Sequence, residues 1–336
     1  MAANKLQARV AGAGTLDQLQ KVLRAAPLHA WTASSLTTAW HRLAKHGGTV
    51  TSCKVLSSAQ RHVGFAAPPR SIACMVWAWG KLEFKEAECL DGICNEIPIN
   101  ISSFSTRDVA NVLYGFGLLR HRPVRIVVML CDTLSLNMNG ASSQTLANVA
   151  YSLAVLNFKH YRFWSLLGHC VPPRVHEFKS QELSMMLYSC ALMRVQHDKL
   201  LKVSCESAQR RLNEFSPQNI SNMVYALGLL RYTEPSFLES ACASVSCSFE
   251  NFTAQGISNI TYSLGLLGFS NQMFMARLLL GLPKRMNELS PQHIGNIAYA
   301  LSRMSRRARP VLRSGVELRS LKGVNEFQTS TRNCTK

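Results

Sequence analysis

Hydrophobic and polar positions along this chain repeat at a fixed interval of 37 residues, marked by one aromatic anchor in each copy. The anchors are Trp77, Tyr114, Tyr151, Tyr188, Tyr225, Tyr262 and Tyr299. Around each anchor, apolar residues stand five, two and one positions before it and two and five positions after it. At 100° per residue these positions fall on one side of a helix. A strict period of this length predicts a solenoid of stacked helical units.

Each unit is predicted to contain two helices. In the copy anchored at Tyr225, Ser216 is a good N-cap and Pro217 suits the first helical position. A second apolar pattern with i, i+3, i+4, i+7 spacing follows a short polar turn. Small residues recur four positions before and three positions after the anchor, as at Ser221 and Gly228. Glycine is costly inside a helix, so this stripe predicts close packing of the next repeat.

A further copy surrounds His41, one residue out of register, and brings the total to about eight. We therefore predict an all-α fold, a right-handed α-solenoid of about eight 37-residue helix-turn-helix repeats, with the handedness taken by analogy. Residues 15–304 form the repeat domain in this interpretation. Residues 1–14 are an extension with a weak likeness to a targeting peptide. Residues 305–336 are a basic, Arg/Ser-rich tail that is expected to be disordered.

Charge points to a polyanionic partner. The chain has 37 Lys and Arg against 19 Asp and Glu, a net charge of +18, which favours nucleic acid. The 11 cysteines lack zinc-ligand spacing, and we interpret them as small core residues rather than as metal ligands or disulfides. No catalytic motif or phosphate loop occurs, so we expect no enzyme activity, no cofactor and no small-molecule substrate. No apolar run is long enough to cross a membrane.

A polar stripe lies opposite the apolar side of each first helix. Seven residues before the anchor stand Gln144, Gln181, Gln218, Gln255 and Gln292. Three before it stand Asn111, Asn148, Asn222, Asn259 and Asn296. The residue six before the anchor varies and is polar in Asp108, Thr145, Glu182, Asn219 and His293. A constant frame of amides and aromatic rings beside a variable position could read unpaired bases. Alternatively, the amides form a buried ladder between repeats and the rings fill the groove.

Basic residues also recur in register with the anchor. Arg120, Arg194 and Arg231 follow it by six residues, and a second group lies 22 or 23 residues after it. That second group consists of Arg174, Arg210, Arg211, Lys284 and Arg285. These positions are helix C-termini, where the helix dipole favours cations without any ligand. Their common register also permits a track for a phosphate backbone.

The run Ser216-Pro217-Gln218 followed by Asn222, Tyr225, Ala226 and Leu227 resembles the octotricopeptide repeat family of organellar RNA-binding proteins. The opening Thr38-Ala39-Trp40-His41 is similar to the start of the array in FAST-kinase-like and RAP-domain proteins and in helical-repeat subunits of RNA-editing substrate-binding complexes. The resemblance implies an organellar protein, of mitochondrion or chloroplast, that acts in transcript stability, processing, editing or translation. It implies single-stranded RNA as the partner, together with other RNA-processing proteins. No RAP domain follows residue 304 in this sequence.

The sequence therefore predicts a non-catalytic, sequence-selective binder of single-stranded RNA, with no membrane partner. An armadillo-like scaffold that binds peptides is the alternative, because armadillo arrays also display asparagine ladders. The excess of positive charge favours RNA over the scaffold.

Overall fold

A computed structural model describes residues 2–312 of this chain, with side chains as far as Met304. Within that part every regular element is a helix, and no strand occurs, which confirms the predicted all-α solenoid of helical repeats. The chain divides into two compact units, Met1–Ala241 and Cys242–Lys336. The division falls inside the helix α14, which spans Pro235–Cys247.

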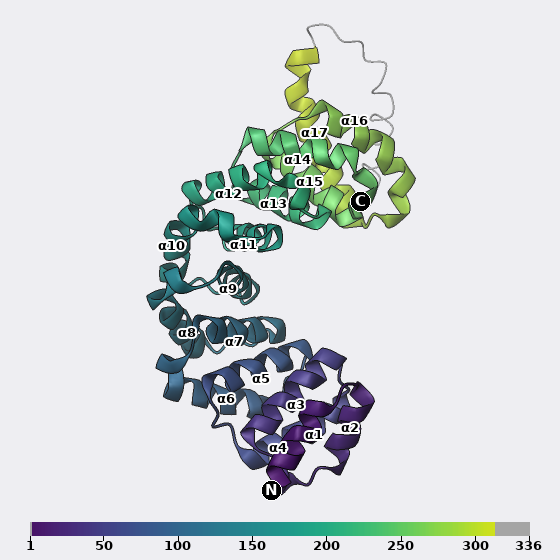
Figure 1. The fold of residues 1–336 in the computed structure, drawn as a ribbon. Helices are drawn as coiled ribbons and strands as arrows, with labels where there is room; N and C mark the ends of the chain where they lie inside the picture. Colours follow the sequence, from purple (N-terminus) through teal and green to yellow (C-terminus); the bar gives the residue numbers. More distant parts are fainter. Residues whose placement is uncertain (1, 313–336) are drawn as a thin grey trace, which may run out of the picture. The chain divides into compact units, whose positions relative to one another are not determined.

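The first unit is built from alternating first and second helices of successive repeats. The first helices are α3 (Ala33–His46), α5 (Pro69–Lys81), α7 (Thr106–Leu119), α9 (Ser143–Val155), α11 (Ser180–Leu192) and α13 (Pro217–Leu230). The second helices are α4 (Val50–Val63), α6 (Ala87–Asn100), α8 (Val124–Leu136), α10 (Tyr161–Cys170) and α12 (Asp198–Arg210). Each first helix packs on the next first helix, and the second helices form a parallel row beside them (Figure 1). Each repeat therefore contacts its neighbours in two layers.

The second unit continues the same pattern. It contains α15 (Ala254–Leu267), α16 (Gln272–Gly281), the 3₁₀ segment η7 (Leu282–Glu288) and α17 (Pro291–Leu312). The first helices α15 and α17 pack against each other, and α16 packs on η7. Similar 3₁₀ turns, such as η4 (Pro172–Glu177) and η5 (Leu212–Glu214), end second helices in the first unit.

The predicted apolar stripe forms the core. In α13 all five predicted positions are buried, namely Ile220, Met223, Val224, Leu227 and Leu230. The second-helix prediction is less accurate: in α16 the i, i+3, i+4, i+7 pattern of Met275, Leu278, Leu279 and Leu282 predicts burial, but Leu279 is 38 % exposed. The N-caps are confirmed, since Ser216 accepts a hydrogen bond from the backbone N–H of Asn219 and Pro217 begins the helix.

Small residues mark the closest approaches between first helices, as predicted. A Cβ atom added to Gly265 would lie 2.6 Å from the Cα of Ala300 in α17. A Cβ atom on Gly80 would lie 2.9 Å from the Cα of Gly115 in α7. Real Cβ atoms do not approach backbone so closely, so these positions require glycine.

Both ends of the described part of the chain are helical. Ala2–Gly12 forms a helix, α1, whose Leu6 and Val10 are buried and which packs against α3. Leu16–Ala25 forms α2, which packs on α3 and α4. At the other end, residues 305–312 continue α17 as helix, although disorder was predicted from residue 305. Arg and Ala are good helix formers, which explains the continuation. The rest of the predicted tail, 313–336, lies outside the described residues.

Candidate nucleic-acid interface

The five glutamines of the polar stripe are exposed on the first helices. Each stands at the second position of its helix, where the side chain points away from the apolar core. Gln144, Gln181 and Gln218 belong to the first unit, and Gln255 and Gln292 to the second. Arg70 and Arg107 occupy the same position in earlier repeats and are exposed as well. Amide and guanidinium donors are therefore presented to solvent at one register position.

The five asparagines are half-buried and do not form a hydrogen-bonded ladder. Asn148, Asn222, Asn259 and Asn296 lie one turn after a glutamine, and Asn111 lies one turn after Arg107. Within the described residues none of these amide groups is hydrogen-bonded to the protein, and none of their polar atoms is fully buried. Buried amides normally find partners. These amides can thus bond to water or to a ligand.

Aromatic anchors of neighbouring repeats lie ring against ring. In the first unit the rings of Tyr188 and Tyr225 are 6.1 Å apart with an interplanar angle of 33°, and those of His41 and Trp77 are 5.5 Å apart. In the second unit Tyr262 and Tyr299 are 5.7 Å apart. Burial, followed by the nearby Tyr151, raises the pKa of Tyr188. We call the exposed glutamines, half-buried asparagines and anchor rings on the first helices of the first unit the amide–aromatic surface, and the second unit carries a corresponding set of its own.

The variable position is a capping position, and its role as a base reader stays a prediction. It is the third residue of the first helix, and in α7 and α13 its side chain turns back to the N-cap, whereas in α15 the position is Gly256. Asp108 accepts a hydrogen bond from the N–H of Ser105, and His293 accepts one from the N–H of Ser290. Glu182 does the same for Lys179 at 3.0 Å and is buried, as is Thr145, although both were predicted to be exposed.

Asn219 adds a contact between repeats to this capping role. Its carbonyl oxygen accepts from the N–H of Ser216, and its amide donates to the hydroxyl of Ser184 in the preceding first helix at 3.1 Å. The side chain thus has protein partners for both of its polar atoms. The variation among these residues reflects the several side chains that can satisfy a helix N-terminus.

Three of the proposed phosphate ligands make contacts between repeats, and their binding to phosphate stays a prediction. Arg174, Arg211 and Arg285 each reach back 33 to 36 residues to a backbone carbonyl of the preceding repeat. Arg285 donates to the carbonyl of Phe252 at 2.7 Å and forms an ion pair with Glu288 at 2.5 Å. Arg174 and Arg211 form the equivalent pairs with Glu177 and Glu214. We call these three arginines the inter-repeat clamps.

The neighbours of two clamps remain available to a ligand. Arg210 precedes Arg211, and Lys284 precedes Arg285, yet both of these side chains are exposed. Within the described residues neither forms an ion pair, because the carboxylates nearby are bound by the clamps. Of the five residues in the second basic group, Arg210 and Lys284 are therefore the better candidates for a phosphate contact.

Arg120, Arg194 and Arg231 are exposed residues that end first helices in a left-handed backbone conformation. Their φ angles are 52°, 51° and 57°. The same register position holds Glu83, Asn157 and Gly268, which also have positive φ. Helices commonly end with glycine in this conformation, because other residues crowd their Cβ atom. The arginines thus occupy a position where the fold itself favours glycine.

We expect Arg120→Gly to raise the free energy of unfolding by about 1 kcal/mol, because glycine relieves the left-handed strain. Arg120→Ala is the matched control, since it removes the same charge and keeps a Cβ atom. Chemical denaturation of both variants measures the difference. Equal stabilities for the glycine and alanine variants would show that φ at this position carries no cost.

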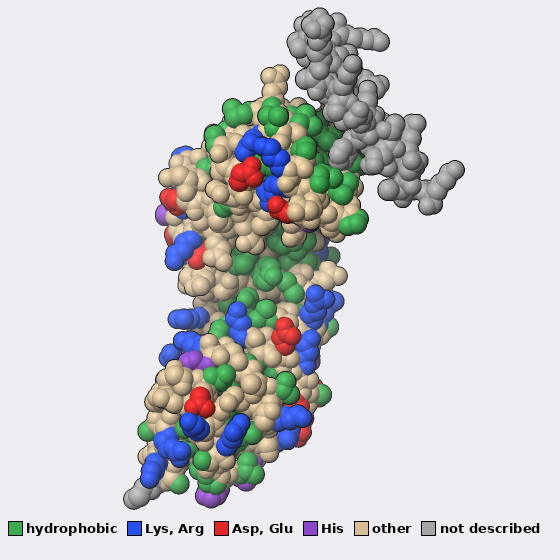
Figure 2. Space-filling view, turned by 90° about the vertical axis from the view of Figure 1, so that its right-hand side faces the viewer, with side chains coloured by type: hydrophobic (Ala, Val, Ile, Leu, Met, Phe, Trp, Pro, Cys, Tyr) green, Lys and Arg blue, Asp and Glu red, His purple; other side chains and the backbone are tan. Residues whose placement is uncertain are grey.

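Several exposed cations of the first unit were not selected from the sequence. Arg122 and Lys159 lie in the turns that join first and second helices, and Arg125 and Arg162 are the second residues of α8 and α10. The signal was present, since Arg122 and Lys159 share one register position and Arg125 and Arg162 share another. In the lower half of Figure 2, which belongs to the first unit, Lys and Arg side chains outnumber acidic ones.

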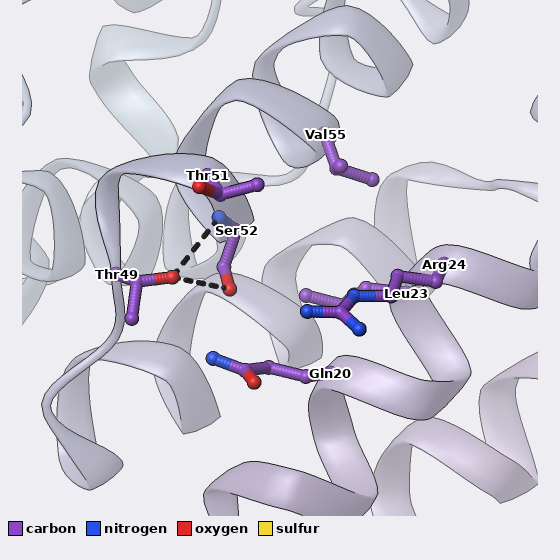
Figure 3. Close-up of a pocket in the computed structure, with 7 residues that line it drawn as sticks. All are labelled: Gln20, Leu23, Arg24, Thr49, Thr51, Ser52 and Val55. Carbon is purple, nitrogen blue, oxygen red and sulfur yellow. Dashed lines mark hydrogen bonds between the residues drawn. The ribbon is translucent and has the colours of Figure 1, made fainter.

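A cavity of about 230 Å³ lies between α2 and α4 (Figure 3). Arg24 is the one charged residue of the seven that line it. The Thr49 hydroxyl is engaged in capping α4, because it accepts from the N–H of Ser52.

The described residues hold no group of three or more potential metal-ligating side chains. None of the described helices has both the length and the apolar character needed to cross a bilayer.

Comparison with known proteins adds information for the C-terminal half of the chain. A family described as RNA-editing substrate-binding complex 8 protein matches residues 168–333. This stretch is similar to a subunit of an RNA-editing complex. The match supports the predicted likeness to RNA-editing helical-repeat subunits, whereas the octotricopeptide and FAST-kinase relationships stay predictions. No curated protein matches the chain.

Proposed function

We propose that this protein binds single-stranded RNA through the amide–aromatic surface and acts as a non-catalytic subunit in mitochondrial RNA editing. The observation that carries the proposal is the row of half-exposed rings, such as Tyr188 and Tyr225, beside amides without protein partners. Aromatic faces stack on unpaired bases, and amides bond to base edges. The similarity of residues 168–333 to the RNA-editing substrate-binding complex 8 family supports an editing role.

In this proposal sequence selectivity comes from the glutamines, which the sequence predicted as base-contacting residues together with the variable position. Because the variable position caps the helix, the exposed glutamine beside it is the better candidate for base contacts. In the repeats anchored at Trp77 and Tyr114, where Arg70 and Arg107 replace glutamine, contact with phosphate or guanine is favoured instead. The net charge of +18 supplies affinity that does not depend on sequence.

We expect the double variant Tyr188→Ala/Tyr225→Ala to lose about tenfold or more in affinity for single-stranded RNA, because stacking contributes about 1–3 kcal/mol per base. The matched control is Tyr188→Phe/Tyr225→Phe, which keeps both rings and removes only the hydroxyl groups. Fluorescence anisotropy with a labelled random 20-mer measures the affinities, and circular dichroism checks that both variants are folded.

Three outcomes decide the proposal. Weak binding by the alanine variant alone supports stacking on RNA. Unchanged binding by a folded alanine variant would mean that these rings only fill the space between repeats. Failure of the wild-type protein to bind RNA even at low salt would favour the peptide-binding scaffold, since half-buried asparagines can also bond to a peptide backbone.

A further inference from the structure

The turns after α7 and α9 carry a concentration of positive charge that other repeats lack. Residues 119–126 and 156–163 contain five cations and no Asp or Glu: Arg120, Arg122, Arg125, Lys159 and Arg162. The equivalent segment of the preceding repeat, 82–89, has one Lys and three Glu, and 230–237 has one Arg and one Glu. Helix dipoles act equally at all of these turns. The dipole therefore does not explain why the charge is confined to two adjacent repeats.

All five cations are exposed, and none forms an ion pair with an acidic side chain of the described residues. The preceding repeat differs, because its Glu86 and Glu88 are paired with Arg61. Two acids reach this region, and both lie near histidines: Asp132 is 3.3 Å from the imidazole of His160, and Asp91 interacts electrostatically with His121. Five uncompensated cations on neighbouring turns repel one another, which is a cost that an anionic ligand would remove.

Aromatic rings lie among these cations and order some of them. The guanidinium of Arg122 lies over the buried Phe158 ring at 5.2 Å, and the Lys159 ammonium lies 5.8 Å from the Tyr161 ring. Tyr161 is 77 % exposed, and Val124 holds the same register position in the preceding repeat at 55 % exposed. An exposed tyrosine ring surrounded by cations suits an unpaired base flanked by phosphates.

The two turns lie next to each other in space. First helices α7 and α9 are in contact, and so are second helices α8 and α10 (Figure 1). Residues of equal register in packed helices are separated by about 8–10 Å, the usual distance between helix axes. Arg122 thus neighbours Lys159, and Arg125 neighbours Arg162. We call Arg120, Arg122, Arg125, Lys159, Tyr161 and Arg162 the basic edge.

We propose that the basic edge is a second RNA-binding site, at which the cations bind the phosphate backbone and Tyr161 stacks on an unpaired base. This inference rests on the proposed function, because it assigns the same class of ligand to a different part of the first unit. The basic edge lies at the turns between helices, whereas the amide–aromatic surface lies along the first helices. The edge contributes affinity and salt dependence rather than base reading.

The test uses the full chain and a fluorescein-labelled 20-mer of uridylate, with anisotropy measured over a range of KCl concentrations. In Arg122→Gln/Arg125→Gln/Arg162→Gln we expect a loss of about tenfold or more at low salt, and a salt slope smaller by about 2, since single strands give about 0.7 per phosphate contact. The matched control is Lys5→Gln/Arg9→Gln/Lys54→Gln, which removes the same charge from exposed positions on α1 and α4. It should retain most of the affinity and the full slope.

A second pair of variants separates stacking from charge. Tyr161→Ala should weaken binding by about tenfold, whereas Tyr161→Phe should bind as the wild type does. If the wild-type protein binds RNA and the triple glutamine variant binds with the same affinity and the same salt slope, the proposal for the basic edge is overturned and the proposed function is left intact. Absence of any wild-type binding would overturn both. If a polyglutamate of the same charge competes for the protein as well as the RNA does, and Tyr161→Ala does not change RNA affinity, the ligand of the basic edge is an acidic protein rather than RNA.

Discussion

Gly115→Ala should destabilise the first unit by about 1–3 kcal/mol, the usual cost of forcing extra atoms into a packed core. A Cβ atom at this position would lie 2.3 Å from the backbone oxygen of Val76 and 2.6 Å from its carbonyl carbon. Backbone atoms of a packed helix cannot move aside as the end of a flexible side chain can. Helices α5 and α7 would have to separate, and that separation would disturb the packing of the neighbouring repeats.

Gly117→Ala is the matched control for this prediction, because Gly117 lies in the same helix two residues later. Its added Cβ atom would lie 3.5 Å from the Cα of Ser152, an ordinary van der Waals distance. Alanine is the better helix former, so this variant should gain about 0.5–1 kcal/mol. Chemical denaturation followed by circular dichroism compares the two. Shifts of the same sign for both variants would show that the contact with Val76 is not what limits position 115.

Arg285→Ala should destabilise the second unit by about 2–3 kcal/mol, because it leaves buried acceptors without their donor. The side chain is only 12 % exposed. It donates to the carbonyls of Phe252 at 2.7 Å and Phe249 at 3.4 Å, both in the preceding repeat. Arg285→Lys should recover only part of the loss, since an ammonium group cannot reproduce the forked geometry of guanidinium.

Lys284→Ala is the control for the clamp. It removes the same charge from the adjacent residue, whose side chain is exposed, and should change stability by less than about 0.5 kcal/mol. For RNA affinity we expect the opposite order: Lys284→Ala should weaken binding more than Arg285→Ala does, because Lys284 is available to phosphate while Arg285 is engaged with protein. Thermal denaturation and RNA anisotropy on the same two variants test both statements. Equal destabilisation by both variants would contradict the clamp.

The sequence by itself determined the repeat, the helices and the core. The period of 37 residues predicts a stack of repeated units. Within each unit the 3.6-residue periodicity predicts which side of the helix is buried, as the buried Ile220, Val224 and Leu227 show. The caps at Ser216 and Pro217 could be predicted because they depend on local backbone geometry alone. The exposure of the glutamines follows from the same helical geometry.

Only the tertiary structure decided which recurring polar residues remain available to a ligand. A polar residue can recur in every repeat for a structural reason or for a functional one. Its position in the repeat therefore could not show that Arg211 binds the neighbouring repeat while Arg210 is exposed, or that the variable position caps the helix while the glutamine beside it is exposed. The carbonyl that Arg211 binds, that of Phe178, lies 33 residues away. The positive φ of Arg120 is likewise a property of the helix end. Hydrogen-bond partners and backbone conformation depend on how repeats stack, which periodicity does not specify.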